Sequence, residues 1–475
     1  MKKHTRGLRD VMKHTALIGS LSFLAPLATI GLVYFETQTV SSQTARTILR
    51  AQDPGVRAGA AAAGGALSGV TEHETEYFLA GKEEFEEVEG VAQGLGPTLN
   101  LDSCGGCHSQ PAIGGTSPAV NPQVAFATLN GGQDLVPSFL SANGPVREAR
   151  FVSNRDGTPD GGVHALFTIT GRDGAGACQL SQPDFATQLA NRNVVFRIPT
   201  PTFGLGLIEQ IPDSAILSNM AANAAAKTVL GIRGRANFHV GGRTISGQTN
   251  HNGNDGTIAR FGWKAQNKSL LLFSGEAYNV EMGISNELFQ NERDETANCL
   301  IASHPNSVTH PEADATIDAL SAIEKFAFFM RLLAPPTPSL DTPGGAQSIA
   351  SGKSVFDAVG CAYCHTPGFT TGNSAVAALR NQDVKLFSDL LVHDMGIGLA
   401  DGVSQGQAGP REFRTAPLWG LGQRIFFLHD GRTSDLAAAI RAHQSFGSEA
   451  NGVIASFQIL TENQKQALFN FLRSL

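Results

Sequence analysis

Two short motifs with the pattern Cys-x-x-Cys-His constrain this chain of 475 residues more than any other feature, and they occupy residues 104–108 and 361–365. Cysteines three residues apart lie on one side of a helical turn, so both sulfur atoms can bond to one prosthetic group while the adjacent histidine ligates its metal. The spacing is specific for covalent attachment of haem c. The sequence therefore predicts two covalently bound haem c groups, attached through Cys104, Cys107, Cys361 and Cys364 and ligated by His108 and His365.

A zinc site and a redox-active dithiol are the alternatives for these cysteines. Zinc would need further ligands close to each pair, whereas the two motifs lie in opposite halves of the chain. Cys178 and Cys299 stand outside the motifs. Because two remaining cysteines usually pair in an oxidising compartment, we expect a disulfide between them. Two separate buried thiols, or a redox-active pair, are the alternatives.

The amino terminus predicts export from the cytoplasm. Five basic residues precede an apolar run over about residues 15–35, and a basic start before an apolar stretch is typical of an export signal. The run is also long enough to span a bilayer. We therefore expect residues 1–45 to be a cleaved signal or a membrane anchor. Either places the body of the protein in the periplasm, soluble or anchored to the inner membrane.

Composition and helix signals divide the rest of the chain into three parts. Residues 46–70 are rich in Ala, Gly, Ser and Thr and are expected to form a flexible arm. Residues 71–340 are expected to form an N-terminal haem domain with a β-containing insertion, and residues 341–475 a C-terminal cytochrome c domain. The boundary falls at the proline-rich segment 334–340, because prolines end helices. The expected fold class is mainly α, with two cytochrome c-like domains of which the first is expanded by loops.

The first half contains one clear helix signal and two strand signals. Thr71 and Glu74 form a capping-box pair, which predicts a helix that runs to about Val91. The runs 164–170 and 194–198 are bounded by Gly, Asp and Pro and predict strands.

Three later segments predict helices. Apolar residues on one helical face predict a helix that contains residues 317–326 and ends before Pro335. Residues 352–360 predict a short helix that leads into the second motif, and Thr461 with Gln464 begins a C-terminal helix. Its apolar face carries Leu468, Phe471, Leu472 and Leu475, and a phenylalanine precedes each motif on its helix, at Phe85 and Phe356, as a weak internal repeat.

The second axial ligand of each haem decides its role. An iron with two protein ligands transfers electrons, whereas an open iron can bind peroxide or oxygen. Most lone histidines and methionines are structural, so few of the candidates are expected to be ligands. The candidates are His164, His239, His251, His304, His310, His393, His429, His443, Met282 and Met395.

Four longer segments carry a family resemblance. They are SCGGCHSQPAIGG (103–115), FGWKAQ (261–266), EMGISN (281–286) and FRTAPLWGLGQRIFFLHDG (413–431). They resemble the bacterial di-haem oxidoreductase family, often labelled thiol oxidoreductase or peroxidase-like, over about residues 70–475. That family is more distantly similar to the bacterial di-haem cytochrome c peroxidases.

The resemblance implies a ligand for the C-terminal haem. In the peroxidases a methionine, fourteen residues after the histidine of an HDG segment, ligates the electron-transfer haem. Counting from His429 gives His443, which is our first choice for the distal ligand, with Met395 as the second. An iron with two histidines has a lower reduction potential than one with His and Met, because Met raises it.

The resemblance also assigns roles around the N-terminal haem. The distal histidine of the peroxidases falls near Val124 here, and no close substitute is found, so this haem is expected to be open. Glu209, in an apolar segment, is the candidate proton carrier, and a glutamate bonded to local backbone is the alternative. Trp263 and Trp419 are candidates for electron transfer between the haems, with plain packing as the alternative.

The expected function is oxidoreduction. The N-terminal haem would react with peroxide or another small oxidant, and the C-terminal haem would pass on electrons from a donor protein or a small reductant. The alternatives are a non-catalytic di-haem electron carrier and a di-haem oxygenase or maturation enzyme. The net charge of −7 argues against a nucleic-acid partner, because phosphate binding needs a basic face.

Overall fold

The computed structural model describes residues 50–238, 244–245, 248–249 and 258–475. The predicted export segment, His239 and His251 lie outside the described residues. Within the described part of the chain, no helix is long and apolar enough to cross a membrane.

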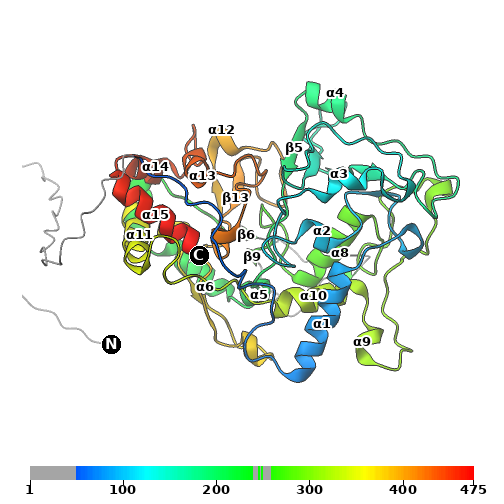
Figure 1. The fold of residues 1–475 in the computed structure, drawn as a ribbon, viewed down its shortest axis with the longest axis horizontal. Coiled ribbons are helices and arrows are strands. Elements are labelled where there is room, and N and C mark those ends of the chain that lie inside the picture. The colour runs from blue at the N-terminus through cyan, green and yellow to red at the C-terminus, as the bar shows by residue number, and fades with distance from the viewer. Residues whose placement is uncertain (1–49, 239–243, 246–247, 250–257) are drawn as a thin grey trace, which may run out of the picture. The chain divides into compact units, whose positions relative to one another are not determined.

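Short helices and small sheets alternate along the chain (Figure 1). The helices are α1 (Glu72–Glu86), α2 (Cys104–Cys107), α3 (Pro122–Phe126), α4 (Phe185–Ala190), α5 (Leu205–Glu209), α6 (Asp213–Ala221), α7 (Ala224–Leu230), α8 (Leu270–Met282), α9 (Thr316–Ala319), α10 (Ala322–Leu332), α11 (Ala346–Val359), α12 (Gly396–Leu399), α13 (Leu436–Ala442), α14 (Asn451–Gln458) and α15 (Glu462–Ser474). The expectation of a mainly helical fold with a β-containing region is confirmed.

The strands are all short. They are β1 (Thr98–Leu99), β2 (Glu148–Phe151), β3 (Val163–His164), β4 (Phe167–Thr168), β5 (Val194–Arg197), β6 (Asn237–Phe238), β7 (Thr244–Ile245), β8 (Gln248–Thr249), β9 (Ile258–Ala259), β10 (Phe369–Thr370), β11 (Asp383–Val384), β12 (Val392–Asp394) and β13 (Glu412–Arg414). In the described residues the largest sheet has three strands in the order β3-β2-β5, all antiparallel. Its register sets Glu148 opposite Arg197.

Two pairs of packed helices support the two motifs, and they repeat one design. The helix before the first motif, α1, packs on α10, and the helix before the second, α11, packs on α15. A Cβ atom on Gly81 would collide with the carbonyl oxygen of Lys325, and one on Gly352 with that of Ala467. Glycine therefore lets the two helices of each pair approach closely. Phe85 and Phe356 follow these glycines by one helical turn, which strengthens the internal repeat.

The capping signals are confirmed. Thr71 with Glu74 caps α1, and Thr461 with Gln464 caps α15. The apolar residues expected on one face of α15, from Leu468 to Leu475, are all buried.

Several predicted boundaries need correction. The first helix ends at Glu86 rather than near Val91, and α11 begins at Ala346 rather than Gly352. The apolar run at 317–326 is two helices, because α9 ends at Ala319 and Ser321 caps α10 with Glu324. The run 164–170 is divided between β3 and β4, which pair with β2 and β1, because the backbone N–H of the intervening Leu166 bonds to the side chain of Asn100 (2.8 Å).

Cys178 and Cys299 form a disulfide, with their Cα atoms 4.6 Å apart. Both residues are buried, and the disulfide joins the loop between β4 and α4 to the segment after α8. The expected pairing is confirmed. Ile48–Leu475 cluster as one compact unit, and the larger apolar core runs across residue 340. The division into domains at 340 stays a prediction.

Two candidate haem sites

The N-terminal motif forms one helical turn, α2, closed by a hydrogen bond from His108 N to Cys104 O (3.0 Å). The ring of Phe85 contacts the ring of His108 edge-on, with the centroids 5.8 Å apart. The His108 Nδ1 atom lies 2.9 Å from the carbonyl oxygen of Gly115, which leaves Nε2 to face a metal. Burial lowers the pKa of His108 to about 4, so the ring is neutral and can act as a ligand.

The C-terminal motif repeats this geometry. His365 N donates to Cys361 O over 2.8 Å, and His365 Nδ1 lies 3.0 Å from the carbonyl oxygen of Phe387. Phe356 lies beside the His365 ring, with the centroids 6.4 Å apart. Burial, and then the nearby His443, lower the pKa of His365 to about 4. Each motif thus presents a neutral, oriented imidazole beside two cysteines.

Each motif opens into its own cavity. The N-terminal cavity has a volume of about 400 Å³ and is lined by Cys104, Cys107 and His108. The C-terminal cavity has a volume of about 220 Å³ and is lined by the second motif, Cys361, Cys364 and His365, together with many apolar side chains.

His443 lines the C-terminal cavity with His365. It follows α13 directly, and its Nδ1 atom lies 2.8 Å from the carbonyl oxygen of Ala439. Burial lowers the pKa of His443. A neutral ring held in this way keeps Nε2 free for a metal. Met395 lines the same cavity, so both candidates from the sequence are brought to it.

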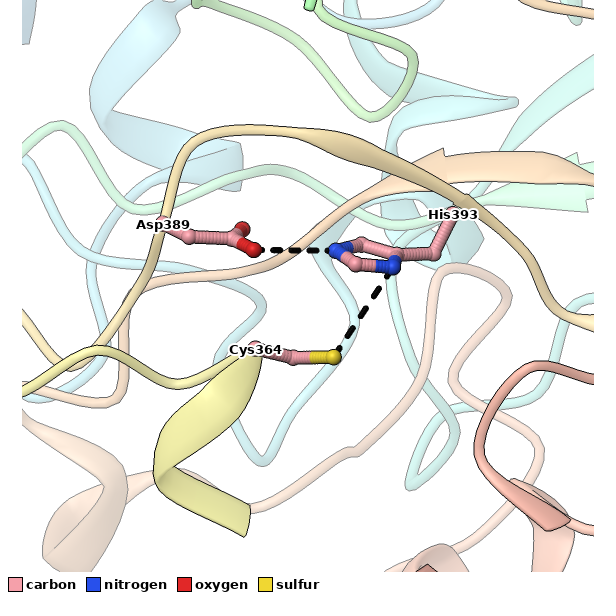
Figure 2. Close-up of side chains that lie close together, drawn as sticks. All are labelled: Cys364, Asp389 and His393. Carbon is pink, nitrogen blue, oxygen red and sulfur yellow. Dashed lines mark hydrogen bonds and ion pairs between the residues drawn. The ribbon is translucent and has the colours of Figure 1, made fainter. Parts of the chain in front are cut away.

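His393 also lines this cavity, but both of its ring nitrogens are engaged (Figure 2). Nε2 lies 3.0 Å from Asp389 Oδ2, and Nδ1 lies 2.9 Å from Glu449 Oε2. The Cys364 sulfur is 3.8 Å from Nδ1. A histidine held between two carboxylates supports the wall of the cavity and is not free to ligate iron.

The N-terminal cavity has a charged wall in place of a second imidazole. Among the described residues that line it, His108 is the only histidine. Glu148 and Glu281 share a hydrogen bond, Arg150 Nε donates to Glu148, and Asn100 Nδ2 donates to Glu281 Oε2 over 2.7 Å. All four residues line the cavity.

The two glutamates have opposite pKa shifts. Burial, and then repulsion from Glu148, raise the pKa of Glu281. Burial also pushes the pKa of Glu148 upward, but the positive charges of Arg150 and Arg197 outweigh it and hold the pKa below its usual value. Glu281 is therefore the protonated member of the pair near neutral pH, and Glu148 the ionised one.

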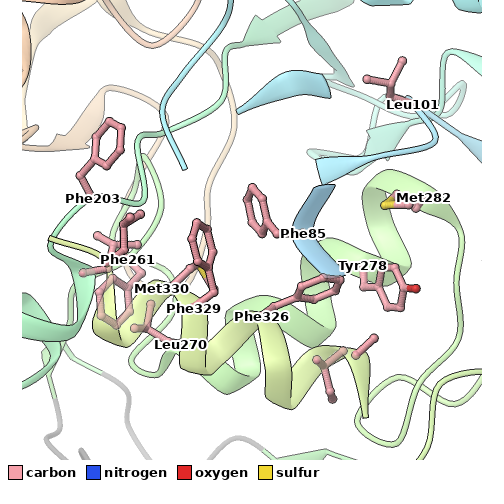
Figure 3. Close-up of a cluster of buried hydrophobic side chains, with 14 of the residues drawn as sticks. Phe85, Leu101, Phe203, Phe261, Leu270, Tyr278, Met282, Phe326, Phe329 and Met330 are labelled. Atoms are coloured by element: carbon pink, nitrogen blue, oxygen red, sulfur yellow. The ribbon is translucent and has the colours of Figure 1, made fainter. Parts of the chain in front are cut away.

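Val124, Met282 and Met330 differ in how they lie relative to the N-terminal cavity. Val124 packs on the apolar core and is absent from the described lining, which agrees with the missing distal histidine. Met282 lines the cavity with its sulfur 3.8 Å from the Cys104 sulfur, where the edge of a haem would be attached. Met330 on α10 also lines the cavity and lies beside Phe329 in the larger apolar core (Figure 3).

Glu209 is not brought to either cavity. Its carboxylate accepts hydrogen bonds from Arg331 Nε (2.8 Å) and from the backbone N–H of Leu270 (2.9 Å). These contacts tie α5 to α10 and to the start of α8. These partners come from distant segments, rather than from the local backbone that the sequence left open as the alternative, and the catalytic role of Glu209 stays a prediction.

Trp263 lines both cavities. Its Nε1 donates to the carbonyl oxygen of Ile198 (2.9 Å), and its ring lies edge-on to His429, with the centroids 6.4 Å apart. His429 lines the C-terminal cavity and stacks on Phe413 at 4.3 Å. Trp419 is buried in the apolar core and lines neither cavity, so packing accounts for it.

The remaining histidines lie away from both cavities in the described part of the chain. His164 stacks on Phe151, and its Nε2 atom lies 2.9 Å from Asp160. His304 lies beside Glu292, and His310 is exposed.

Buried guanidinium groups show that both cavities suit a haem. The Nε atoms of Arg147 and Arg197, which line the N-terminal cavity, are buried with no hydrogen-bond partner among the described residues. Arg414 and Arg424 line the C-terminal cavity, and burial, followed by repulsion from neighbouring arginines, lowers the pKa of each to about 10. Haem propionates would supply the carboxylates that such groups need.

Sequence reasoning missed the Glu148–Glu281 pair. The only signal was the segment 281–286, which was used for the resemblance and for Met282 but not for its glutamate. The partner, Glu148, begins β2, far away in the chain, and no short motif marks it.

Comparison with known proteins gives one family match. A family model described as "Di-haem oxidoreductase, putative peroxidase" matches residues 154–475, more than half of the chain. No curated protein matches the chain.

Two solved structures are distantly similar. The diheme peroxidase BthA from Burkholderia thailandensis is 14% identical, with a TM-score of 0.29, over 45% of this chain and 65% of that one. Hydrazine synthase from Kuenenia stuttgartiensis is 17% identical, with a TM-score of 0.21, over 34% of this chain and 56% of that one. The chain thus spans less than two thirds of each structure.

Proposed function

The chain belongs to the di-haem oxidoreductase family, and from that premise we propose that it reduces peroxide at the N-terminal site with electrons passed through the C-terminal site. Both haems are attached covalently through the two motifs. The protein is exported and acts in the periplasm, and its electrons come from a donor protein or a small reductant. The two motifs belong to two cytochrome c-like domains, at 71–340 and 341–475.

One observation carries the proposal: the two cavities differ in the side chains that share them with the motif histidine. The C-terminal cavity contains His443, whose Nδ1 is held by Ala439 and whose Nε2 can complete a six-coordinate iron. The described lining of the N-terminal cavity contains a carboxylic acid pair and arginines but no second histidine. An iron with two histidine ligands is suited to electron transfer, and an open iron to reaction with a small oxidant.

The haem in the N-terminal cavity would supply the iron that binds peroxide. The surrounding residues manage protons and charge. Glu281 holds a proton that it can donate to a leaving oxygen, and Glu148 is the base beside it. Arg150 keeps Glu148 ionised, and Asn100 orients Glu281. Trp263 lies between the two sites and can carry electrons from one cavity to the other.

Replacing Glu281 by Gln tests the proposal. The variant keeps the shape of the side chain and its bond to Asn100 but removes the proton carrier, so kcat/KM for hydrogen peroxide should fall about 10²-fold or more. The haem content and spin state should stay unchanged. Glu292→Gln is the matched control, because Glu292 is buried outside both cavities and burial raises its pKa to about 7.

Two outcomes would contradict the proposal. If Glu209→Gln slows turnover while Glu281→Gln does not, the proton carrier is Glu209. If the wild-type protein, loaded with both haems, does not consume peroxide with any reductant, the non-catalytic electron carrier is the better description.

A further inference from the structure

Tyr278 stands at the edge of the N-terminal cavity with its hydroxyl group bonded to a buried carboxylate. It lies on α8, lines the cavity and is 3% exposed. Its hydroxyl donates a hydrogen bond to Glu89 Oε1 over 2.7 Å. Phe326 packs edge-on against its ring, and Figure 3 shows the hydroxyl oxygen pointing away from Phe326 and Phe85. The ring therefore faces the haem site and the oxygen faces Glu89.

Glu89 is connected to the surface by other carboxylates. It is buried, and a carboxylate oxygen of Glu84 and one of the exposed Glu87 lie within 4.8 Å of its own. Burial raises the pKa of Glu89 to about 7, against the hydrogen bond from Tyr278 and with repulsion from Glu87 and Glu84. A proton that arrives at Glu89 can therefore leave through this chain of carboxylates.

The two residues form a unit for coupled loss of an electron and a proton. Burial and the charge of Glu89 raise the pKa of Tyr278, so the phenol does not ionise by itself. A base within hydrogen-bond distance allows the proton to leave when the electron does. We propose that Tyr278 is an oxidisable residue of the N-terminal site, which gives an electron to that site and its phenolic proton to Glu89. The inference rests on the proposed function, which supplies peroxide as the oxidant.

The step balances with the electrons that the proposed function provides. Hydrogen peroxide takes up two electrons and two protons and leaves as two water molecules, with one proton from Glu281 and the other from solvent. One electron would come from the C-terminal site through Trp263, which lines both cavities, and the other from Tyr278. The Tyr278 O–H bond breaks, an O–H bond forms on Glu89 Oε1, and a neutral tyrosyl radical remains. A later electron from the donor reduces the radical, and the proton returns from Glu89.

Freeze-quench electron paramagnetic resonance tests this inference on the holoprotein with its C-terminal haem reduced, mixed with hydrogen peroxide. A radical signal that narrows when the tyrosines are ring-deuterated is expected in the wild type. The signal should be lost in Tyr278→Phe and several-fold weaker in Glu89→Gln. It should persist in Tyr77→Phe, the matched control on α1. Infrared difference spectra should show a protonated-carboxyl band with the radical, and Glu89→Gln should lack this band.

The outcomes separate this inference from the proposed function. Peroxide consumption with no tyrosyl signal, or with a signal that survives Tyr278→Phe, overturns the inference alone. If peroxide is not consumed, both fall. Haem content shows whether each variant has folded and loaded. Should Tyr278→Phe fail to load, an unweakened signal in Glu89→Gln would still overturn the assignment.

Discussion

The two haem sites share a scaffold and differ in the side chains that share each cavity with the motif histidine. In both, a helix with glycine and phenylalanine one turn apart packs on a second helix, the motif closes one turn, and a backbone carbonyl orients the histidine. The C-terminal cavity then adds His443, whereas the N-terminal cavity adds the Glu148–Glu281 pair.

The shared scaffold therefore fixes attachment, while the other residues that line each cavity fix its role. The N-terminal wall comes from β2 and α8, which lie in the part of the chain between the two helices of the first pair. The C-terminal wall includes His443, directly after α13, between the two helices of the second pair. The two sites thus differ in the segments of the chain that lie between their two supporting helices.

Removing one haem at a time should separate the two roles completely. Changing Cys104 and Cys107 to Ala should halve the haem content, abolish peroxide consumption and leave the C-terminal haem with an unchanged spectrum. Changing Cys361 and Cys364 to Ala should leave the haem that binds external ligands such as cyanide. Haem content, cyanide titration and peroxide turnover check this. Cyanide binding that disappears with the second pair of cysteines would invert the comparison.

The C-terminal haem should respond to its distal ligand. His443→Met should raise its reduction potential, within the ~0.8 V range over which axial ligands set haem potentials, because Met favours the reduced iron. His443→Ala should turn this haem high-spin. Met395→Leu is the control and should change neither property. A redox titration followed by visible spectra gives the potential and the spin state. A high-spin C-terminal haem in Met395→Leu would make Met395 the ligand.

A smaller effect is expected on stability. The folded pKa of Glu281 is raised above its unfolded value, so the folded state binds this proton more tightly, and stability is lost as pH rises from the unfolded pKa through the folded one. The free energy of unfolding of the wild type should therefore fall relative to Glu281→Gln above about pH 5, by at most about 1.4 kcal/mol per pH unit. Denaturant unfolding of the holoprotein at several pH values measures this. A difference that stays constant with pH would mean that Glu281 is ionised in the folded protein.

The sequence predicted what is local and missed what the fold assembles. The motifs, the caps at Thr71 and Thr461 and the helix after Thr461 depend on neighbouring residues, so short patterns were sufficient. Ser321 and Glu324 carry the same capping pattern, but the apolar spacing across them concealed the break between α9 and α10.

The proton carrier could not be identified in this way. Glu209 and Glu281 both lie in apolar segments, and only the fold shows that Arg331 holds one while the other faces a cavity beside Glu148. Likewise, His393 and His443 differ only in their partners. Two carboxylates hold His393, and one carbonyl holds His443. Asp389 and Ala439 lie four residues before their histidines, but Glu449 comes from a distant segment that no local pattern connects to His393.

The most direct test of this account is electron paramagnetic resonance of the fully oxidised protein, loaded with both haems. The account predicts one high-spin iron, assigned to the N-terminal site by its loss when Cys104 and Cys107 are changed, and one low-spin iron with two histidine ligands. Two low-spin irons in both the oxidised and the half-reduced protein would contradict it.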